Sequence, residues 1–342
     1  MMNKVVYVFF LLSFLCTAVF AEGYDELIAE ASNKLWESDY QAALELYQQA
    51  FQLEDGSTFD YYNAACAASR CENSNLAFVY LEKAANSNLI EKQWLEEDED
   101  LIILHSDSRW NTLLEAIDAR TDSILTSLPE EHPEGPVVAL PQPRLSSDVS
   151  VEEAMQNRRS LRIYEDSPLT LTEVSQLLWS AYGLTYQIEN GPDFLRGGLR
   201  TAPSAGALFP LELYLVVRNV TVLESGIYWY KSETHELVRI ASENHWEEIS
   251  YSAFDQIHFE TAAAAVVWSA IFERCTDSYG DRGRERYVCM DLGHSAENVY
   301  LQAYALNIGT CAIGSFSDLI LRQAIQMTRI EEPLYIMPIG RV

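Results

Sequence analysis

The chain has 342 residues, of which 48% are hydrophobic, so it is long enough for two domains, each with its own core. It carries 23 Lys and Arg against 51 Asp and Glu, a formal net charge of −28. Phosphate backbones are bound by clustered cations, so this composition excludes nucleic acid as the main partner.

Residues 1–21 have the pattern of a secretory signal peptide. Lys4 precedes an apolar run over 5–20, and the segment ends at Ala21. A charged start, an apolar centre and a small residue at the end are typical of such peptides. The alternative is an uncleaved membrane anchor, because the run approaches the length that spans a bilayer. Both interpretations predict an exported protein, periplasmic or otherwise extracytoplasmic.

Residues 22–125 are predicted to be helical and to resemble tetratricopeptide repeats. Alanine, a large apolar residue and alanine stand at positions 43, 47 and 50, and again 34 residues later at 77, 81 and 84. This offset is typical of the second helix of that repeat. The alternative is a generic helical bundle. Repeats of this kind bind a protein or peptide partner, or serve as a scaffold.

Residues 126–149 are rich in proline and are predicted to be an extended linker to a second domain over 150–342. In that domain we expect helices at 151–160, 169–184 and 291–307, with Thr172 capping the second and Gly309 ending the third. We expect strands at 211–220, 225–231, 235–240, 262–271 and near the C-terminus. Interspersed helices and strands indicate an α+β or α/β domain.

Cysteine and histidine give no sign of a metal site. The six cysteines include no C-x-x-C pair, and the six histidines are scattered. We therefore expect neither a bound metal nor a disulfide scaffold.

The first candidate binding segment is NRRSLRIYEDSPLT, residues 157–170. Arg158, Arg159 and Arg162 crowd together in a strongly acidic chain. Arginine forks match phosphate oxygens, and Ser160 adds a hydroxyl donor, so the segment predicts a phosphate site. The alternative is a surface patch that balances neighbouring acidic residues.

Two further stretches combine small residues with polar groups. Pro203, Ser204, Ala205 and Gly206 form a tight turn before a buried strand, in which missing side chains would let a ligand lie on the backbone. The alternative is a turn kept small to admit a helix. Near the C-terminus, Gly314 in CAIGSF would again let a ligand approach the backbone, and Arg341 in PIGRV adds a cation. The alternative for Arg341 is a C-terminal charge pair.

These stretches resemble, in order, the nitroreductase family, and most of all its SagB-type dehydrogenase branch. The motifs are RRSLRIY, PLTLTEVSQLLWSAYGLT, RTAPSAGALFPLELYLVV, GIYWY, the segment from Tyr279 through CAIGSF, and EEPLYIMPIGR. The resemblance covers about 151–342. It implies an α+β sandwich with a mixed sheet wrapped by helices, and a homodimer with FMN bound at each end of the subunit interface.

The resemblance also implies roles for residues of this chain. The FMN phosphate, ribityl chain and one ring edge would be held by Arg158, Arg159, Ser160 and Arg162, and Arg341 would return to the phosphate. The flavin ring would be lined by Pro203, Ser204, Ala205, Gly206 and Leu208, with Ile313 and Gly314 at its reactive edge. The helix through His294, Asn298 and Leu301 would pack at the dimer interface.

The implied activity is FMN-dependent hydride or electron transfer to or from a small-molecule or peptide substrate. SagB-type azoline dehydrogenases carry a Lys-Tyr pair before a glycine; here Ser278 and Tyr279 precede Gly280. Tyr279 is the catalytic candidate, and its alternative is a buried structural tyrosine. Export would also separate the protein from cytoplasmic NAD(P)H. The alternative function is a non-catalytic flavin-fold protein whose repeats recruit a partner.

Overall fold

The computed structural model describes residues 23–342, so the predicted signal peptide lies outside the described residues. The chain divides into two compact units, Met1–Ile124 and Leu125–Val342. No helix within 23–342 is both long enough and apolar enough to cross a membrane.

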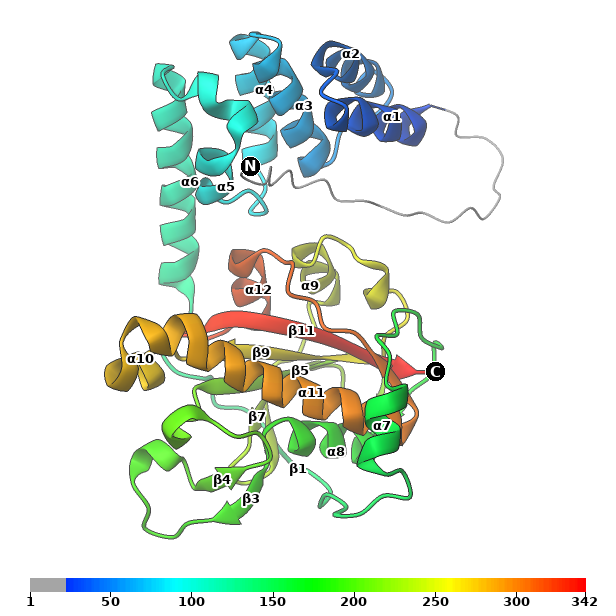
Figure 1. The fold of residues 1–342 in the computed structure, drawn as a ribbon, viewed down its shortest axis with the longest axis vertical. Coiled ribbons are helices and arrows are strands. Elements are labelled where there is room, and N and C mark those ends of the chain that lie inside the picture. The colour runs from blue at the N-terminus through cyan, green and yellow to red at the C-terminus, as the bar shows by residue number, and fades with distance from the viewer. Residues whose placement is uncertain (1–22) are drawn as a thin grey trace. The chain divides into compact units, whose positions relative to one another are not determined.

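The N-terminal unit consists of helices (Figure 1). They are α1 (Tyr24–Trp36), α2 (Tyr40–Ala50), α3 (Thr58–Arg70), α4 (Ser74–Ala85), α5 (Lys92–Glu97), a 3-10 helix (Glu99–Leu104) and α6 (Ser108–Ser127), which runs on into the second unit. Helix α1 packs on α2, α2 on α3, and α3 on α4. The predicted repeat positions 43, 47, 50, 77, 81 and 84 are all buried, on α2 and α4.

The two helical hairpins also share their turns, which the sequence pattern did not reveal. Ser38 and Glu72, 34 residues apart, both have positive φ, at 63° and 59°. The next residues, Asp39 and Asn73, each accept a hydrogen bond from the first turn of the following helix. A left-handed residue and a side-chain cap thus end one helix and start the next. The assignment to tetratricopeptide repeats stays a prediction.

The C-terminal unit mixes helices and strands, as the α+β prediction requires. Its helices are α7 (Val151–Asn157), α8 (Leu171–Tyr182), α9 (Trp246–Ser252), α10 (Glu273–Tyr279), a π-helix (Gly283–Tyr287), α11 (Val288–Leu306) and α12 (Asp318–Ile325). Its strands are β1 (Val137–Ala139), β2 (Leu169–Thr170), β3 (Leu184–Gln187), β4 (Gly198–Arg200), β5 (Leu211–Val217), β6 (Val220–Thr221), β7 (Gly226–Lys231), β8 (Glu236–Ala241), β9 (Ala264–Ala270), β10 (Ile308–Thr310) and β11 (Glu332–Arg341).

Seven of these strands form the main sheet, in the order β1-β8-β7-β5-β9-β11-β10. All its neighbouring strands run antiparallel, with Leu215 of β5 opposite Val266 of β9, for example. The parallel pairing lies in the separate two-stranded sheet β2–β6. The central strands β5 and β9 are buried along their whole length.

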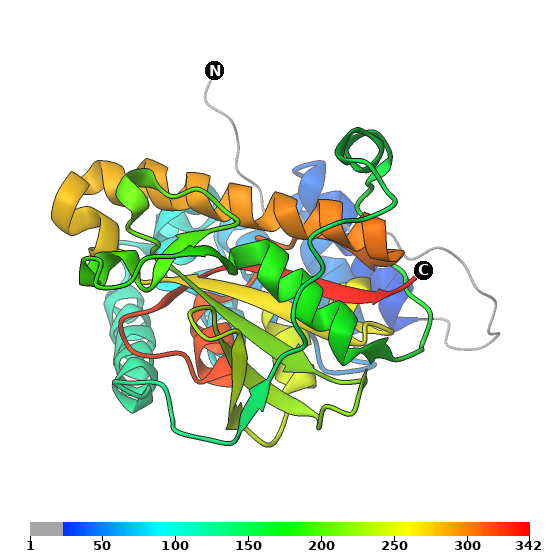
Figure 2. The ribbon, with the colours of Figure 1, turned by 90° about the horizontal axis from the view of Figure 1, so that it is seen from below.

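Helices cover both faces of the sheet (Figures 1 and 2). Leu213, Leu215 and Val217 share a hydrophobic core with α8 and α11. The intervening Tyr214 and Val216 share a second core with α9 and α12. Alternate side chains of a strand point to opposite faces, so an apolar run without polar interruptions suits a strand covered twice.

The predicted linker differs from expectation because part of it joins the sheet. We call residues 126–149 the strap. Its β1 pairs with β8 at the sheet edge, with Val138 opposite Leu237. A Cβ on Gly135 would collide with the carbonyl oxygen of Arg239. Glycine therefore allows the strap to lie directly on the neighbouring backbone.

Two helix ends also differ from the predicted ones. Helix α8 is capped by Thr170, not Thr172, in a reciprocal capping box with Glu173. Helix α11 ends at Asn307, which adopts a left-handed φ of 55°, and Gly309 lies in β10. Asparagine tolerates this conformation because its short polar side chain bonds locally.

Candidate functional site

The predicted phosphate-binding arginines lie at the end of α7, where the chain leaves the helix. We call residues 158–162 the arginine segment. Arg158 is the C-cap of α7, and its guanidinium lies 5.1 Å from the ring centre of Tyr300 and 3.9 Å from Glu297. Arg159 is exposed and donates to backbone carbonyls only. Within residues 23–342, no carboxylate forms an ion pair with Arg159 or Arg162.

Tyr300 of α11 joins the arginine segment to the second predicted stretch. Its hydroxyl lies 3.2 Å from the Ser160 hydroxyl and accepts a hydrogen bond of 2.7 Å from the backbone N–H of Ala312. Ile313 exchanges two backbone hydrogen bonds with β11 and is buried, whereas Gly314 is exposed. The structure therefore brings together Ser160, Ile313 and Gly314, which the sequence separates by about 150 residues.

Arg341 lies at the end of β11, and its guanidinium already has a partner. It forms two hydrogen bonds with the carboxylate of Glu173, at 2.7 and 2.9 Å. Burial raises the pKa of Glu173, but the bonds from Arg341 and Thr170 outweigh it, and the pKa lies below its ordinary value. This pair ties the last strand to the start of α8. It is the charge pair that the sequence left open as the alternative for Arg341.

The predicted ring-lining residues form a turn with an unusual backbone. We call residues 203–208 the small-residue turn. Gly206, Ala207 and the following Phe209 have φ of 65°, 55° and 47°. Non-glycine residues pay on the order of 1 kcal/mol for this region. Pro203 is exposed, and Leu208 is half-buried against the main core. Such strain persists only where surrounding contacts hold the backbone.

Helix α11 supplies one set of these contacts. The Asp291 carboxylate accepts from the Ala205 N–H at 3.3 Å. His294 and Asn298 lie 3.2 and 3.3 Å from the carbonyl oxygens of residues 203 and 201. Positions 291, 294 and 298 share one face of the helix. This face, which the resemblance placed at a dimer interface, thus serves the turn of its own chain.

Arginines supply the other set, at Phe209. The Phe209 carbonyl accepts from Arg196 at 3.2 Å and from Arg274 at 3.4 Å. Both guanidinium groups pair with the buried carboxylate of Glu212, at 2.9 and 2.7 Å. Arg200 lies over the Phe209 ring, 4.5 Å from its centre. The sequence analysis did not identify Arg196, Arg200 and Arg274 as contacts of Phe209. The main signal for them was Glu212, a single glutamate within an apolar strand.

Tyr279, the catalytic candidate, ends α10 and faces the small-residue turn. A Cβ built on Gly206 would lie 2.6 Å from the Tyr279 hydroxyl oxygen. The Tyr279 side chain packs edge-on against Tyr287 and stays partly exposed, at 39% for the residue. A phenol next to the turn and open to solvent is placed to reach a ligand there. The structure therefore differs from the alternative of a buried structural tyrosine.

The contact between Gly206 and Tyr279 makes a testable prediction. Gly206→Ala should destabilise the C-terminal unit by about 1–2 kcal/mol, because the new methyl group meets both a left-handed φ and the phenol oxygen. In a Tyr279→Phe background the oxygen is gone, and the cost should fall to that of the backbone alone, about 1 kcal/mol. Urea denaturation of the four variants measures the difference. Equal costs in both backgrounds would refute the contact.

The candidate residues form two groups along α11. The arginine segment, Ile313 and Gly314 gather at Tyr300, whereas the small-residue turn and Tyr279 gather at Asp291. Tyr300 and Asp291 are nine positions apart on one helix, which is about 13 Å along its axis. The helix thus separates a group rich in cations from a group of small residues with an exposed phenol.

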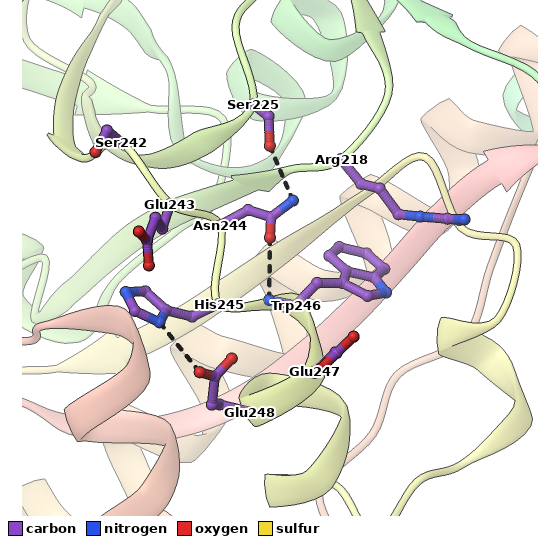
Figure 3. A pocket seen from close by; sticks show the side chains of 9 residues that line it. All are labelled: Arg218, Ser225, Ser242, Glu243, Asn244, His245, Trp246, Glu247 and Glu248. Atoms are coloured by element: carbon purple, nitrogen blue, oxygen red, sulfur yellow. Dashed lines mark hydrogen bonds and ion pairs between the residues drawn. The ribbon is translucent and has the colours of Figure 1, made fainter.

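A surface pocket lies elsewhere, and no predicted site residue lines it (Figure 3). It has a volume of about 550 Å³ and is lined by residues 242–248 with Arg218 and Ser225. Asn244 spans its wall, donating to Ser225 at 2.9 Å and accepting from the Trp246 N–H at 3.1 Å. His245 lies 3.5 Å from Glu248. These polar groups mainly bond one another, so the pocket supports no functional assignment.

Relatives of the chain share the C-terminal unit. A protein of Methanocaldococcus jannaschii that carries a nitroreductase name is 42% identical over 194 residues, which are 57% of this chain and 92% of that protein. The crystal structure of a protein from Anabaena variabilis, also named as a nitroreductase, matches with 27% identity and a TM-score of 0.51. That match covers 60% of this chain and 42% of the Anabaena chain, so this chain spans less than half of that relative.

A third similar structure is the Escherichia coli microcin synthetase McbBCD complex with truncated pro-MccB17 bound. Its identity is 22% and its TM-score 0.45, over 60% of this chain and 78% of that one. The sequence model described as the nitroreductase family matches residues 155–341, more than half of the chain. This range holds both groups of candidate residues and every strand of the main sheet except β1. The chain therefore belongs to the nitroreductase family.

Proposed function

We propose that the C-terminal unit is an FMN-dependent oxidoreductase. The observation that carries the proposal is the pair of residue groups on α11 of a nitroreductase-family chain. One group offers Arg159 and Arg162, which form no ion pair within residues 23–342, and the other offers a backbone turn made mostly of small residues. An elongated ligand with a phosphate at one end and a flat ring at the other needs both.

The arginine segment fits a phosphate. In a chain of net charge −28, Arg159 and Arg162 remain without a carboxylate among the residues the structure describes, although acidic residues are abundant. His258, which is buried, has a pKa lowered to about 4 by burial and by the charge of Arg162. An arginine that keeps its charge unpaired is available for an anion. Arg158, Arg159, Ser160 and Arg162 would hold the FMN phosphate and ribityl chain.

The small-residue turn fits the ring. Gly206 is exposed and has no side chain. Gly314 is also exposed, and a Cβ there would be in van der Waals contact with the Tyr335 ring, at 3.4 Å. Residues 203–206 and Leu208 would line the flavin, with Ile313 and Gly314 at its edge. Contacts within the protein already hold the strained backbone of the turn. Binding a ligand there would therefore cost less conformational entropy.

Bound FMN would supply the hydride or electron transfer. The protein would bind the phosphate, present the turn to the ring and keep one phenol nearby. Tyr279 would hold or donate a proton at its hydroxyl oxygen, beside the turn. Without the lysine of the SagB-type pair, Ser278 adds no base, so we propose a small-molecule or peptide substrate outside azoline oxidation.

We propose a homodimer built through this unit. Large apolar side chains flank the arginine segment and are exposed, among them Val151, Met155 and Ile163. Exposed apolar residues gathered in this way mark an interaction surface. Sedimentation equilibrium at micromolar concentration should give the mass of two chains, and the mass of one chain would refute the proposal.

For the rest of the chain we propose export and a partner. The buried repeat positions and the paired turns of α1–α4 support a tetratricopeptide-like unit that binds a protein or peptide. The apolar run of residues 5–20 supports a signal peptide. Fractionation of cells that express the full chain should find it outside the cytoplasm. Purely cytoplasmic protein would contradict export.

The visible spectrum of protein 22–342, purified with added FMN, tests the proposed function. We expect flavin bands that bleach with dithionite and return in air. A protein that stays colourless and binds no FMN would overturn the oxidoreductase. That result would favour the alternative, a non-catalytic flavin-fold protein whose repeats recruit a partner.

A further inference from the structure

Asp291 is a buried carboxylate with an incomplete set of partners. It lies in the first turn of α11 and is 2% exposed. One oxygen, Oδ1, accepts from the Ala205 N–H at 3.3 Å. The other oxygen, Oδ2, is buried and has no hydrogen-bond partner within residues 23–342. A carboxylate in this state costs the folded protein free energy.

Hydrogen bonds hold the small-residue turn at both ends. The Ser204 oxygen accepts from the Phe209 N–H at 3.0 Å. The Asp291 carboxylate therefore holds residue 205, and the neighbouring Ser204, which also lowers the pKa of Asp291, holds Phe209. Between these fixed points lie Gly206 and Ala207, both with positive φ. Asp291 fixes the start of this strained segment.

Burial raises the pKa of Asp291 above its ordinary value, and only the bonds from Ser204 and Ala205 and the charge of His294 oppose this. Burial raises the pKa of the nearby Cys275 thiol to about 11, and the charge of Asp291 adds to this effect. The carboxyl group therefore lies in an apolar setting that favours its neutral form.

We propose that Asp291 is a positioning residue for the flavin ring: it holds the small-residue turn in the shape that receives the ring. The inference rests on the proposed function. It assigns the ring of the flavin to the small-residue turn beside Asp291, and the phosphate to the arginine segment. The two ends are therefore separable with FMN and riboflavin, which share the ring but differ in the phosphate.

The experiment measures dissociation constants of FMN and riboflavin by quenching of flavin fluorescence. Asp291→Ala should weaken both flavins by tenfold or more, because the turn loses its link. Asp291→Asn keeps an acceptor for the Ala205 N–H and should stay within threefold of the wild type. Ser204→Ala, which cuts only the link to Phe209, should weaken both flavins three- to tenfold. The exposed Asp193→Ala serves as the matched control and should bind as the wild type.

Hydrogen exchange separates positioning from folding. In Asp291→Ala the backbone of residues 203–209 should exchange faster, while β5 and β9 exchange as in the wild type. Two results would overturn the inference and leave the proposed function standing. One is faster exchange throughout the sheet, and the other is flavin binding equal to the wild type in both Asp291→Ala and Ser204→Ala. A wild type that binds neither flavin would overturn the proposed function, and the inference with it.

Discussion

Replacing Glu331 by alanine should destabilise the C-terminal unit by about 3–5 kcal/mol, the range found when a buried ion pair loses one partner. Glu331 is fully buried in the turn before β11. Its oxygens accept hydrogen bonds from Tyr214, Ser269, Thr328 and the ring of His132. His132 comes from the strap and stacks on Trp229, with ring centres 3.8 Å apart. The carboxylate therefore joins the strap to β5, to β9 and to the turn before β11.

The neighbouring Glu332 provides a matched control. It pairs with Arg284, and both side chains are about a third to a half exposed. An exposed pair contributes roughly 0–1 kcal/mol, so Glu332→Ala should change stability little. Urea denaturation of the full chain, followed by hydrogen exchange of β5 and β9, measures the C-terminal unit. A loss for Glu331→Ala no larger than that for Glu332→Ala would show that the strap is not fixed through this carboxylate.

The same group predicts a pH dependence. Burial raises the pKa of Glu331, but bonds from His132, Ser269 and Thr328 and the charge of His132 outweigh it, and the pKa lies below its ordinary value. A carboxyl whose pKa is lowered on folding stabilises the protein above its unfolded pKa, about 4.3, and loses that stabilisation as the pH falls through the folded value. Glu331→Gln should therefore lose less stability between pH 5 and pH 3 than the wild type.

The double change Arg158→Ala and Arg159→Ala should weaken FMN binding about 10²–10⁴-fold. Each charge-assisted bond to phosphate contributes about 1.5–3 kcal/mol, and 1.4 kcal/mol corresponds to a factor of ten. Riboflavin lacks the phosphate, so its affinity should change little. The variant should thus lose the preference for FMN over riboflavin rather than all flavin binding. Fluorescence titration with both flavins measures this preference.

Arg70→Ala combined with Arg109→Ala is the matched control. It also removes two positive charges, but from the N-terminal unit. Both of these side chains are partly exposed as well. General electrostatic attraction would weaken FMN equally in both double variants. An unchanged FMN affinity in the Arg158 and Arg159 variant would place the phosphate elsewhere, and the two arginines would then be surface charges.

Local signals in the sequence were sufficient for helices α7, α8 and α11 and for strands β5, β7, β8, β9 and β11, but not for the shorter elements of the C-terminal unit. Apolar runs predicted β5 and β9, because a strand covered on both faces is mostly apolar. Glu212 in β5 and Ser269 in β9 are buried polar exceptions. Helix α8 was found from its apolar spacing, although its cap is Thr170 rather than Thr172. Thr170 stands three residues before Glu173, which is the spacing of a capping box, so the sequence already contained the signal that favours Thr170.

The strap shows where local reading is insufficient. Five prolines and several acidic residues predicted an extended segment. In the structure residues 126–127 end helix α6 and Val137–Ala139 form strand β1. Nothing in residues 126–149 indicates that 137–139 pair with β8 or that His132 reaches Glu331, about 200 residues away. Strand pairing depends on what lies at the open edge of the sheet, and a buried ion pair depends on partners brought together by the whole fold.

The sequence alone determined the family, the α+β class and the residue types of the candidate site, since ordered motifs record backbone needs such as small residues at a turn. Only the tertiary structure decided which of these residues meet. It joined Ser160 to Ala312 through Tyr300, paired Arg341 with Glu173, placed Tyr279 next to Gly206 and bonded Asp291 to the turn. The reason is physical: residue types follow from local conformation and burial, whereas partners follow from packing between segments far apart in the chain.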